Sequence, residues 1–252
     1  MDGCAGAGPS KNLNVLSAEA LRFHEVVEEL YRQPGILPWS VDAETGRFLY
    51  SLARLAQPDL AVEVGTYHGI STLWLARALE DNGKGQLISL DLFEDPPIED
   101  VQRTIEQARL AGRVQLVRGP STTIGAEACR RAGQPIDLLF IDGDHRVEAC
   151  GADFETLGAL VRMGGLVVLH DIYPERSGRD GPRYVLNFLA ETHSQRNKWQ
   201  VIELPTPAHA PYGLAILQRL AEGPTRVLPR PVYWLYQLCT LFRFWLRGKR
   251  QA

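Results

Sequence analysis

Acidic and imidazole side chains follow two apolar segments of this sequence. The segment Leu138–Ile141 runs directly into Asp142. Likewise, Val167–Leu169 runs into His170 and Asp171. Two carboxylates that lie close together repel each other unless a cation, a proton or an arginine separates them, and oxygen ligands favour Mg²⁺. If the two segments are neighbouring strands, the pattern predicts a magnesium site at Asp142 and Asp171.

Such a site has a definite chemistry. A divalent ion that binds a substrate hydroxyl acidifies it and fixes its orientation. His145 follows Asp142 by three residues, and because an imidazole changes its protonation near neutral pH, we predict that His145 is the general base. The alternatives are turn chemistry at the strand ends for the two aspartates and a solvated turn residue for His145.

A glycine-containing turn offers a second site. Gly65 and Gly69 lie between the apolar segment Ala61–Val64 and a helix that begins near Ser71. Glycine permits positive φ and close approach of a ligand, and a helix N-terminus favours an anionic group. The spacing differs from the dinucleotide fingerprint, while Asp91 ends the next apolar segment, where a carboxylate can accept both hydroxyls of a ribose. The turn therefore predicts a nucleoside site; simple turn glycines and a helix-capping Asp91 are the alternative.

An alternation of strands and helices would bring these side chains together. Short runs rich in Val and Ile, separated by helical stretches of crossover length, are typical of buried parallel strands. Two later strands are predicted to pair antiparallel at the sheet edge. We therefore predict an α/β fold with a doubly wound, mostly parallel seven-stranded sheet, N-terminal helices, the first capped by Ser17, and a C-terminal helix. The predicted strands are 60–64, 86–90, 114–117, 136–141, 166–169, 199–204 and 212–218, and the predicted helices between them are 71–79, 101–110, 123–132, 149–163 and 182–193.

The sequence resembles the class I methyltransferases in the segment Thr45–Tyr50 and in the run VEVGTYHGISTLWLA, and the resemblance covers roughly residues 40 to 218. It is similar to small-molecule O-methyltransferases of the catechol and caffeoyl-CoA type and, more closely, to the macrolide-sugar group. The resemblance implies a Rossmann-like methyltransferase fold, S-adenosyl-L-methionine as the cofactor, and transfer of its methyl group to a small-molecule hydroxyl.

The resemblance also implies roles for the residues around the turn. Glu63, Gly65 and Thr66 would hold the methionine part of the cofactor, and Ser71 its carboxylate. Asp91 would bind the ribose, and the segment from Gly119 to Ser121 the adenine edge. The complete predicted cofactor-binding set is Glu63, Gly65, Thr66, Tyr67, Gly69, Ser71, Asp91, Gly119, Ser121 and Asp142.

At the metal site this sequence departs from the pattern of the family. Metal-dependent relatives place a third ligand beside the second aspartate, commonly an Asn after it or an acid before it, whereas here Ile172 follows Asp171 and His170 precedes it. His170 is the predicted third ligand; Asp144 in its place, a site without metal, and a buried structural histidine are the alternatives. At position 145 catechol-type relatives have a lysine and sugar-type relatives a histidine, as here.

Composition narrows the classes of partner. The chain has 252 residues and a formal charge of −3, so it can bury a core but offers no broad positive field, and we expect no nucleic-acid partner. The four cysteines are scattered, and no apolar stretch reaches the roughly 20 residues that span a bilayer. We therefore expect a cytoplasmic protein without a signal peptide or transmembrane anchor.

Three regions are predicted: a leader and helix over 1–40, a cofactor-binding methyltransferase domain over 41–220, and an extension over 221–252. The extension is aromatic nearly all round and ends in basic residues. We expect it to contact another subunit, which would make the protein a homo-oligomer. Docking on its own domain and a peripheral membrane contact are the alternatives.

The predicted function is magnesium-assisted O-methylation of a small molecule, with a sugar or natural-product hydroxyl as the acceptor. Two other functions are possible in principle. A nicotinamide-dependent oxidoreductase is disfavoured because the dinucleotide glycine spacing and a Tyr-x-x-x-Lys pair are both absent from the sequence. A non-catalytic assembly module that binds S-adenosylmethionine and is recruited through its aromatic extension is the other alternative.

Overall fold

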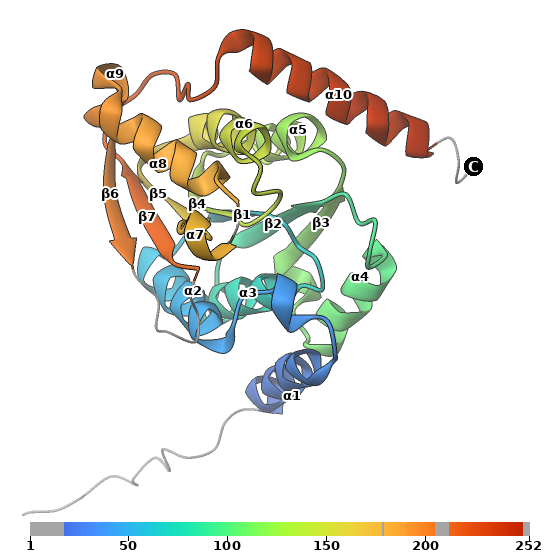
Figure 1. Ribbon diagram of the computed structural model, residues 1–252. Coiled ribbons are helices and arrows are strands. Elements are labelled where there is room, and N and C mark those ends of the chain that lie inside the picture. The colour runs from blue at the N-terminus through green and yellow to red at the C-terminus, as the bar shows by residue number, and fades with distance from the viewer. Residues whose placement is uncertain (1–17, 178, 205–211, 249–252) are drawn as a thin grey trace, which may run out of the picture.

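Seven strands form one sheet with helices on both faces in the computed structural model (Figure 1). The structure describes residues 18–177, 179–204 and 212–248. The strand order is β3-β2-β1-β4-β5-β7-β6; β1 to β5 pair in parallel, and β7 runs antiparallel to both of its neighbours. This confirms the predicted doubly wound sheet and its antiparallel edge. The strands are β1 (Leu60–Val64), β2 (Gln86–Asp91), β3 (Val114–Arg118), β4 (Ile136–Ile141), β5 (Val161–His170), β6 (Trp199–Leu204) and β7 (Leu214–Arg219).

The helices divide between the two faces of the sheet. One face is covered by α1 to α4 and the other by α5, α6 and α8, with α10 lying across the outside of α6 (Figure 1). Among the residues described, none of the helices combines the length and the apolar character needed to cross a membrane. The helices are α1 (Ala18–Arg32), α2 (Ala43–Ala56), α3 (Ile70–Asn82), α4 (Ile98–Gln107), α5 (Ala126–Arg131), α6 (Val147–Leu157), α7 (Pro174–Ser177), α8 (Gly181–Glu191), α9 (His193–Arg196) and α10 (Arg230–Gly248).

Several predicted helices have other bounds than the observed ones, and two differ in kind. The helix predicted over 149–163 ends at Leu157, and β5 already begins at Val161, because Val161 pairs with Ile136 in the sheet and is buried there. The helix predicted over 123–132 is a π-helical turn, Ser121–Gly125, followed by α5. The Ser17 cap and the leader over residues 1–16 lie outside the described residues, and the region boundaries at 40 and 220 stay predictions.

Strand register aligns the carboxyl ends of the four central strands. Val64, the last residue of β1, pairs with Leu90 on one side and with Ile141 on the other. Ile141 in turn pairs with Leu169. The residues that follow these positions therefore lie along one edge of the sheet, where open α/β sheets bind ligands. They are Gly65, Asp91, Asp142 and His170.

The turn after β1 passes very close to the end of β4. Gly65 has φ +93, and a Cβ atom added to it would lie 2.3 Å from the carbonyl oxygen of Asp142. The Asp142 amide donates a hydrogen bond to the Val64 carbonyl at 2.9 Å, which holds the two segments at this separation. Glycine is therefore required at position 65 both by the backbone conformation and by the space available.

We predict that Gly65→Ala lowers the free energy of unfolding by more than about 2 kcal/mol, because strained backbone and a backbone clash add together. Gly35→Ala is the matched control, since Gly35 has a similar φ of +89 but nothing within 4 Å of an added Cβ; it should cost only about 1 kcal/mol. Urea unfolding of the two variants and the wild type measures this difference. Equal losses in both variants would contradict the close-approach argument.

Candidate active site

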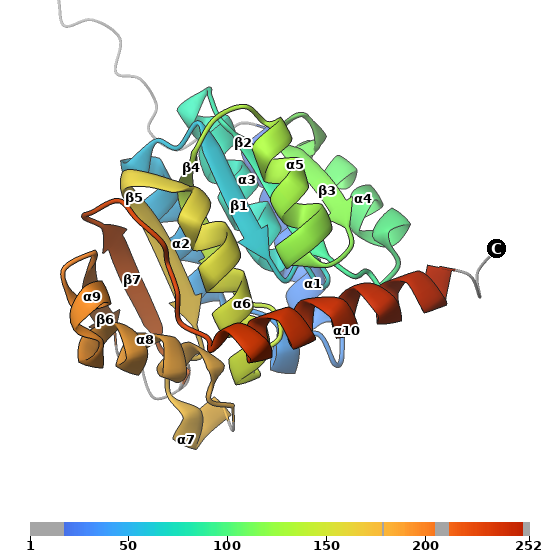
Figure 2. The ribbon, with the colours of Figure 1, turned by 90° about the horizontal axis from the view of Figure 1, so that it is seen from above.

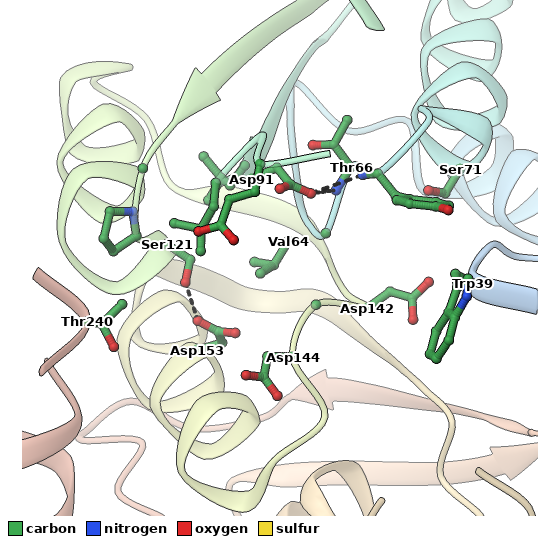
Figure 3. A pocket seen from close by; sticks show the side chains of 18 of the residues that line it. Trp39, Val64, Thr66, Ser71, Asp91, Ser121, Asp142, Asp144, Asp153 and Thr240 are labelled. Atoms are coloured by element: carbon green, nitrogen blue, oxygen red, sulfur yellow. Dashed lines mark hydrogen bonds between the residues drawn. The ribbon is translucent and has the colours of Figure 1, made fainter. Parts of the chain in front are cut away.

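Asp91 holds the turn after β1 in place. Its Oδ2 atom accepts hydrogen bonds from the backbone amides of Thr66, at 2.9 Å, and Tyr67, at 3.0 Å, and its Oδ1 atom accepts one from Phe93 at 2.9 Å. The bond to Thr66 is drawn in Figure 3. Tyr67 adopts a φ of +47, which is unusual for a residue other than glycine. One carboxylate therefore fixes a tight, left-handed turn in front of the sheet edge.

A cavity of about 540 Å³ opens beside this turn. That size is typical of small-molecule sites. The cavity reaches from Trp39, past the turn and Asp91, to the side chains of α10 (Figure 3). The predicted cofactor residues on its wall are Gly65, Thr66, Tyr67, Ser71, Asp91, Gly119, Ser121 and Asp142.

Glu63 and Gly69, the other two predicted cofactor residues, are not on the cavity wall. Glu63 is fully buried behind the turn, where its Oε2 atom accepts hydrogen bonds from Thr72 at 2.5 Å and Ser89 at 2.6 Å. Burial raises the pKa of Glu63 to about 7. Gly69, with φ +86, is the N-cap of α3. The two residues therefore contribute to the cavity indirectly, because they support the turn after β1 and the start of α3, which form part of its wall.

Sequence reasoning missed several parts of the wall, and two of them carry polar side chains from helices on the far side of the cavity. The first is Asp153 on α6, which accepts a hydrogen bond from the Ser121 hydroxyl (Figure 3). Burial raises the pKa of Asp153 to about 7. A signal was present, because Asp153 is an acid among buried small and apolar residues of its helix. The second part comes from the inner face of α10: Tyr236, Thr240, Arg243 and Phe244.

The predicted acid and imidazole groups meet at the ends of β4 and β5. His170 Nδ1 lies 3.0 Å from Asp142 Oδ1 and 3.2 Å from Asp171 Oδ1. His145 Nε2 lies 3.4 Å from Asp142 Oδ1 and 3.6 Å from Asp171 Oδ2. One ligand atom from each of the four residues lies within 4.8 Å of the others, as a metal site requires. We call these four residues the acid–imidazole cluster.

Asp144, the alternative third ligand, is not part of this cluster. Its carboxylate accepts hydrogen bonds from Arg146, one from the backbone amide at 3.0 Å and one from Nε at 2.7 Å. These bonds hold the pKa of Asp144 below its usual value although burial acts in the opposite direction. His170 therefore fits the place of the third ligand better than Asp144 does.

Burial and charge act against each other in the cluster. Burial alone would lower the pKa of His170, but the carboxylates of Asp142 and Asp171 raise it to about 9. For Asp142 burial would raise the pKa, whereas the charge of His170, its hydrogen bond and the nearby imidazole of His145 lower it below its usual value. Burial raises the pKa of Asp171, whose backbone is left-handed with φ +57. A positive charge between the two carboxylates is what stabilises this arrangement.

The cluster fits a divalent cation on two observations. His145 Nε2 and Asp171 Oδ1 are buried and have no hydrogen-bond partner among the described residues, so each has a free lone pair to offer, His145 when its Nε2 is unprotonated. The imidazole of His170 together with the two carboxylates also forms a common donor set for divalent metals, and the imidazole of His145 lies beside it. Because imidazole prefers Zn²⁺ or Fe²⁺ and carboxylates suit Mn²⁺, the set fits these ions at least as well as the predicted Mg²⁺.

Known proteins resemble the part of this chain that contains the candidate site. A family model described as a methyltransferase domain matches residues 62–172. A catechol O-methyltransferase of Niastella koreensis is 38% identical over 112 residues, which make up 44% of this chain and 49% of the relative. Over this segment the chain is similar to S-adenosylmethionine-dependent O-methyltransferases of the catechol and caffeoyl-CoA type. It spans about half the length of the curated relatives it matches.

Solved structures of methyltransferases share the fold. The cofactor-bound crystal structure of Rv0187 from MTB superposes with a TM-score of 0.63 at 25% identity, covering 84% of this chain and 94% of that one. The O-methyltransferase TomG from Streptomyces achromogenes, solved in complex with SAM, gives a TM-score of 0.63 at 23% identity, covering 83% and 93%. The methyltransferase fold expected from the sequence is confirmed. The closer resemblance to macrolide-sugar enzymes stays a prediction.

The buried carboxyl of Asp153 makes stability depend on pH. Its pKa rises from 3.8 to about 7 on folding, so between about pH 4 and pH 7 the folded protein keeps a proton that the unfolded chain releases. Stability is therefore lost as the pH rises through this window. We predict that Asp153→Asn removes this loss, so that its stability relative to the wild type increases by about 1.4 kcal/mol for each pH unit within the window.

Urea unfolding at pH 5 and pH 7 tests this prediction. The difference between Asp153→Asn and the wild type should be larger at pH 7 than at pH 5. Asp144→Asn is the control: because Arg146 holds the pKa of Asp144 below its usual value, this carboxyl is ionised in both the folded and the unfolded state at pH 5 and pH 7, and the difference for Asp144→Asn should be the same at both. If the difference for Asp153→Asn is the same at both pH values, this carboxyl does not titrate as a buried group.

Proposed function

We propose that this protein transfers the methyl group of S-adenosylmethionine to a hydroxyl group of a small molecule. The proposal rests on one observation: Asp142 belongs both to the cavity wall and to the acid–imidazole cluster. Asp142 lines the cavity, and its carboxylate contacts His170 and His145 in the acid–imidazole cluster. A sulfonium methyl group in the cavity and a hydroxyl at the cluster would therefore meet beside one side chain, in the near-attack geometry that methyl transfer needs.

Residues of the cavity wall supply the contacts that the cofactor needs. Asp91 uses its Oδ2 atom for the turn and one lone pair of Oδ1 for the Phe93 amide, which leaves one lone pair of Oδ1 to accept a ribose hydroxyl. Ser71 lies in the first turn of α3, where backbone amides attract the carboxylate of the methionine part. We assign Gly119 and Ser121, which follow β3 on the cavity wall, to the adenine edge.

The acid–imidazole cluster would hold the acceptor. We assign Asp142, Asp171 and His170 as the ligands of a divalent ion, which when bound supplies the Lewis acidity that acidifies a hydroxyl. His145 then takes the hydroxyl proton on Nε2, which has no hydrogen-bond partner among the described residues. In the transfer the C–S bond of the sulfonium breaks, the new C–O bond forms, and the proton leaves on His145. The acceptor is proposed to be a sugar or natural-product hydroxyl.

Asp171 gives a test of the metal site that is separate from cofactor binding. Asp171 is a proposed ligand but does not line the cavity, so we predict that Asp171→Asn lowers kcat by about 100-fold while the Kd for S-adenosylmethionine stays within a few-fold of the wild-type value. Asp144→Asn, which changes a carboxylate on the wall outside the cluster, should keep most of the activity. Calorimetry gives the Kd, and mass spectrometry of a panel of catechols and sugars gives kcat.

The same panel is run after chelation and again with Mg²⁺, Mn²⁺ or Zn²⁺ added. We expect transfer to fall on chelation and to return with one of these ions. Equal rates with and without metal would contradict the metal assignment but would leave methyl transfer itself intact. Failure to bind S-adenosylmethionine would contradict the proposed function as a whole.

His145 is tested by substitution. If it is the general base, His145→Ala should lower kcat by about 10²- to 10⁴-fold. Titration with Mn²⁺ should give the same affinity for variant and wild type. Loss of Mn²⁺ binding in His145→Ala would instead make His145 a fourth ligand.

A further inference from the structure

The helix α10 is attached to the domain along one face only. The hydroxyl groups of Tyr233 and Thr156 are hydrogen-bonded at 2.9 Å, and Arg230 forms an ion pair with Glu155 at 2.7 Å. Further along, Tyr236 and Thr240 lie on the wall of the cavity. Figure 2 shows that α10 crosses the end of α6 and that its later turns extend beyond it. The inner face of the helix is therefore used by the domain.

The outer face of α10 is a continuous apolar stripe. Its residues recur at helical spacing over the whole helix, and each has between 38% and 65% of its surface exposed. Single exposed apolar residues are ordinary, but a contiguous stripe of this length marks a binding surface. The stripe consists of Trp234, Leu235, Leu238, Leu241, Phe242, Trp245 and Leu246.

Charge distinguishes between the possible occupants of this surface. The chain as a whole has a formal charge of −3, yet the segment over residues 223–252 contains six Arg and Lys residues and no Asp or Glu. By helical spacing, Arg230, which is ion-paired with Glu155, falls at one edge of the stripe, whereas Arg243 lies toward the cavity side of the helix. A second copy would bring two such basic segments together, whereas an anionic surface neutralises them. This argues against the subunit contact expected from the sequence.

The side chains of the stripe fit a lipid surface. Tryptophan, at positions 234 and 245, is enriched at the boundary between lipid and water, and the leucines and Phe242 can enter the acyl region. A helix of this kind lies in the plane of the interface, and α10 does not have the apolar character needed to cross the bilayer. We propose that α10 is a peripheral membrane anchor that docks its outer face on a bilayer containing anionic phospholipid. This inference is independent of the proposed methyl transfer.

The test is co-sedimentation of the full chain with vesicles. We expect binding to vesicles of phosphatidylcholine mixed with phosphatidylserine, weaker binding to phosphatidylcholine alone, and a loss of binding at high salt, because the basic residues contribute through screened electrostatics. The double variant Leu238→Glu/Phe242→Glu should bind at least about tenfold more weakly. Both side chains are more than half exposed, so circular dichroism and thermal unfolding should match the wild type.

Leu55→Glu is the matched control. Leu55 is 83% exposed on α2, on the other face of the sheet (Figure 1), and its substitution should leave vesicle binding unchanged. Equal binding of the wild type to both vesicle types, no binding to either, or full binding by the double variant would each overturn the proposal. A concentration-dependent dimer that the double variant abolishes, without vesicle binding, would assign the stripe to a second copy instead.

Discussion

The contact between the turn at Gly65 and the carbonyl group of Asp142 is the constraint on which the rest of the site depends. It brings the end of β1 against the end of β4, so that the proposed cofactor turn and the acid–imidazole cluster share a boundary. A side chain at position 65 would push the two strand ends apart. The cavity and the cluster would then be separate features, and Asp142 could not belong to both.

Electrostatics explains why the cluster is compact. Two carboxylates buried this closely are unfavourable without a positive charge between them, and His170 supplies one when it is protonated. A divalent ion would replace that proton and use the same lone pairs. The cluster therefore surrounds a positive charge both with the proton and with the ion. The left-handed backbone of Asp171 is unfavourable by itself, and the surrounding structure must stabilise it.

The sequence predicted the sheet and most of the site because these depend on local pattern. Val- and Ile-rich runs marked the strands, and the chemistry-bearing residues followed directly at the strand ends. What could not be predicted depends on packing between distant elements. The local sequence pattern does not indicate that Tyr236 and Thr240 of α10 line the cavity. It also does not indicate that Asp153, on a different helix, accepts a hydrogen bond from Ser121. For Glu63 the local pattern was misleading. Its position before the turn suggested contact with a ligand, whereas its side chain lies behind the turn and accepts a hydrogen bond from Ser89.

The role of Asp91 has a further consequence for association entropy. A flexible loop that closes on a ligand loses conformational freedom, and this loss weakens binding. Here the amides of Thr66 and Tyr67 are already fixed by the Asp91 carboxylate before any ligand enters. The entropy lost on binding therefore falls on the ligand rather than on the protein, which makes this wall of the cavity a preorganised surface.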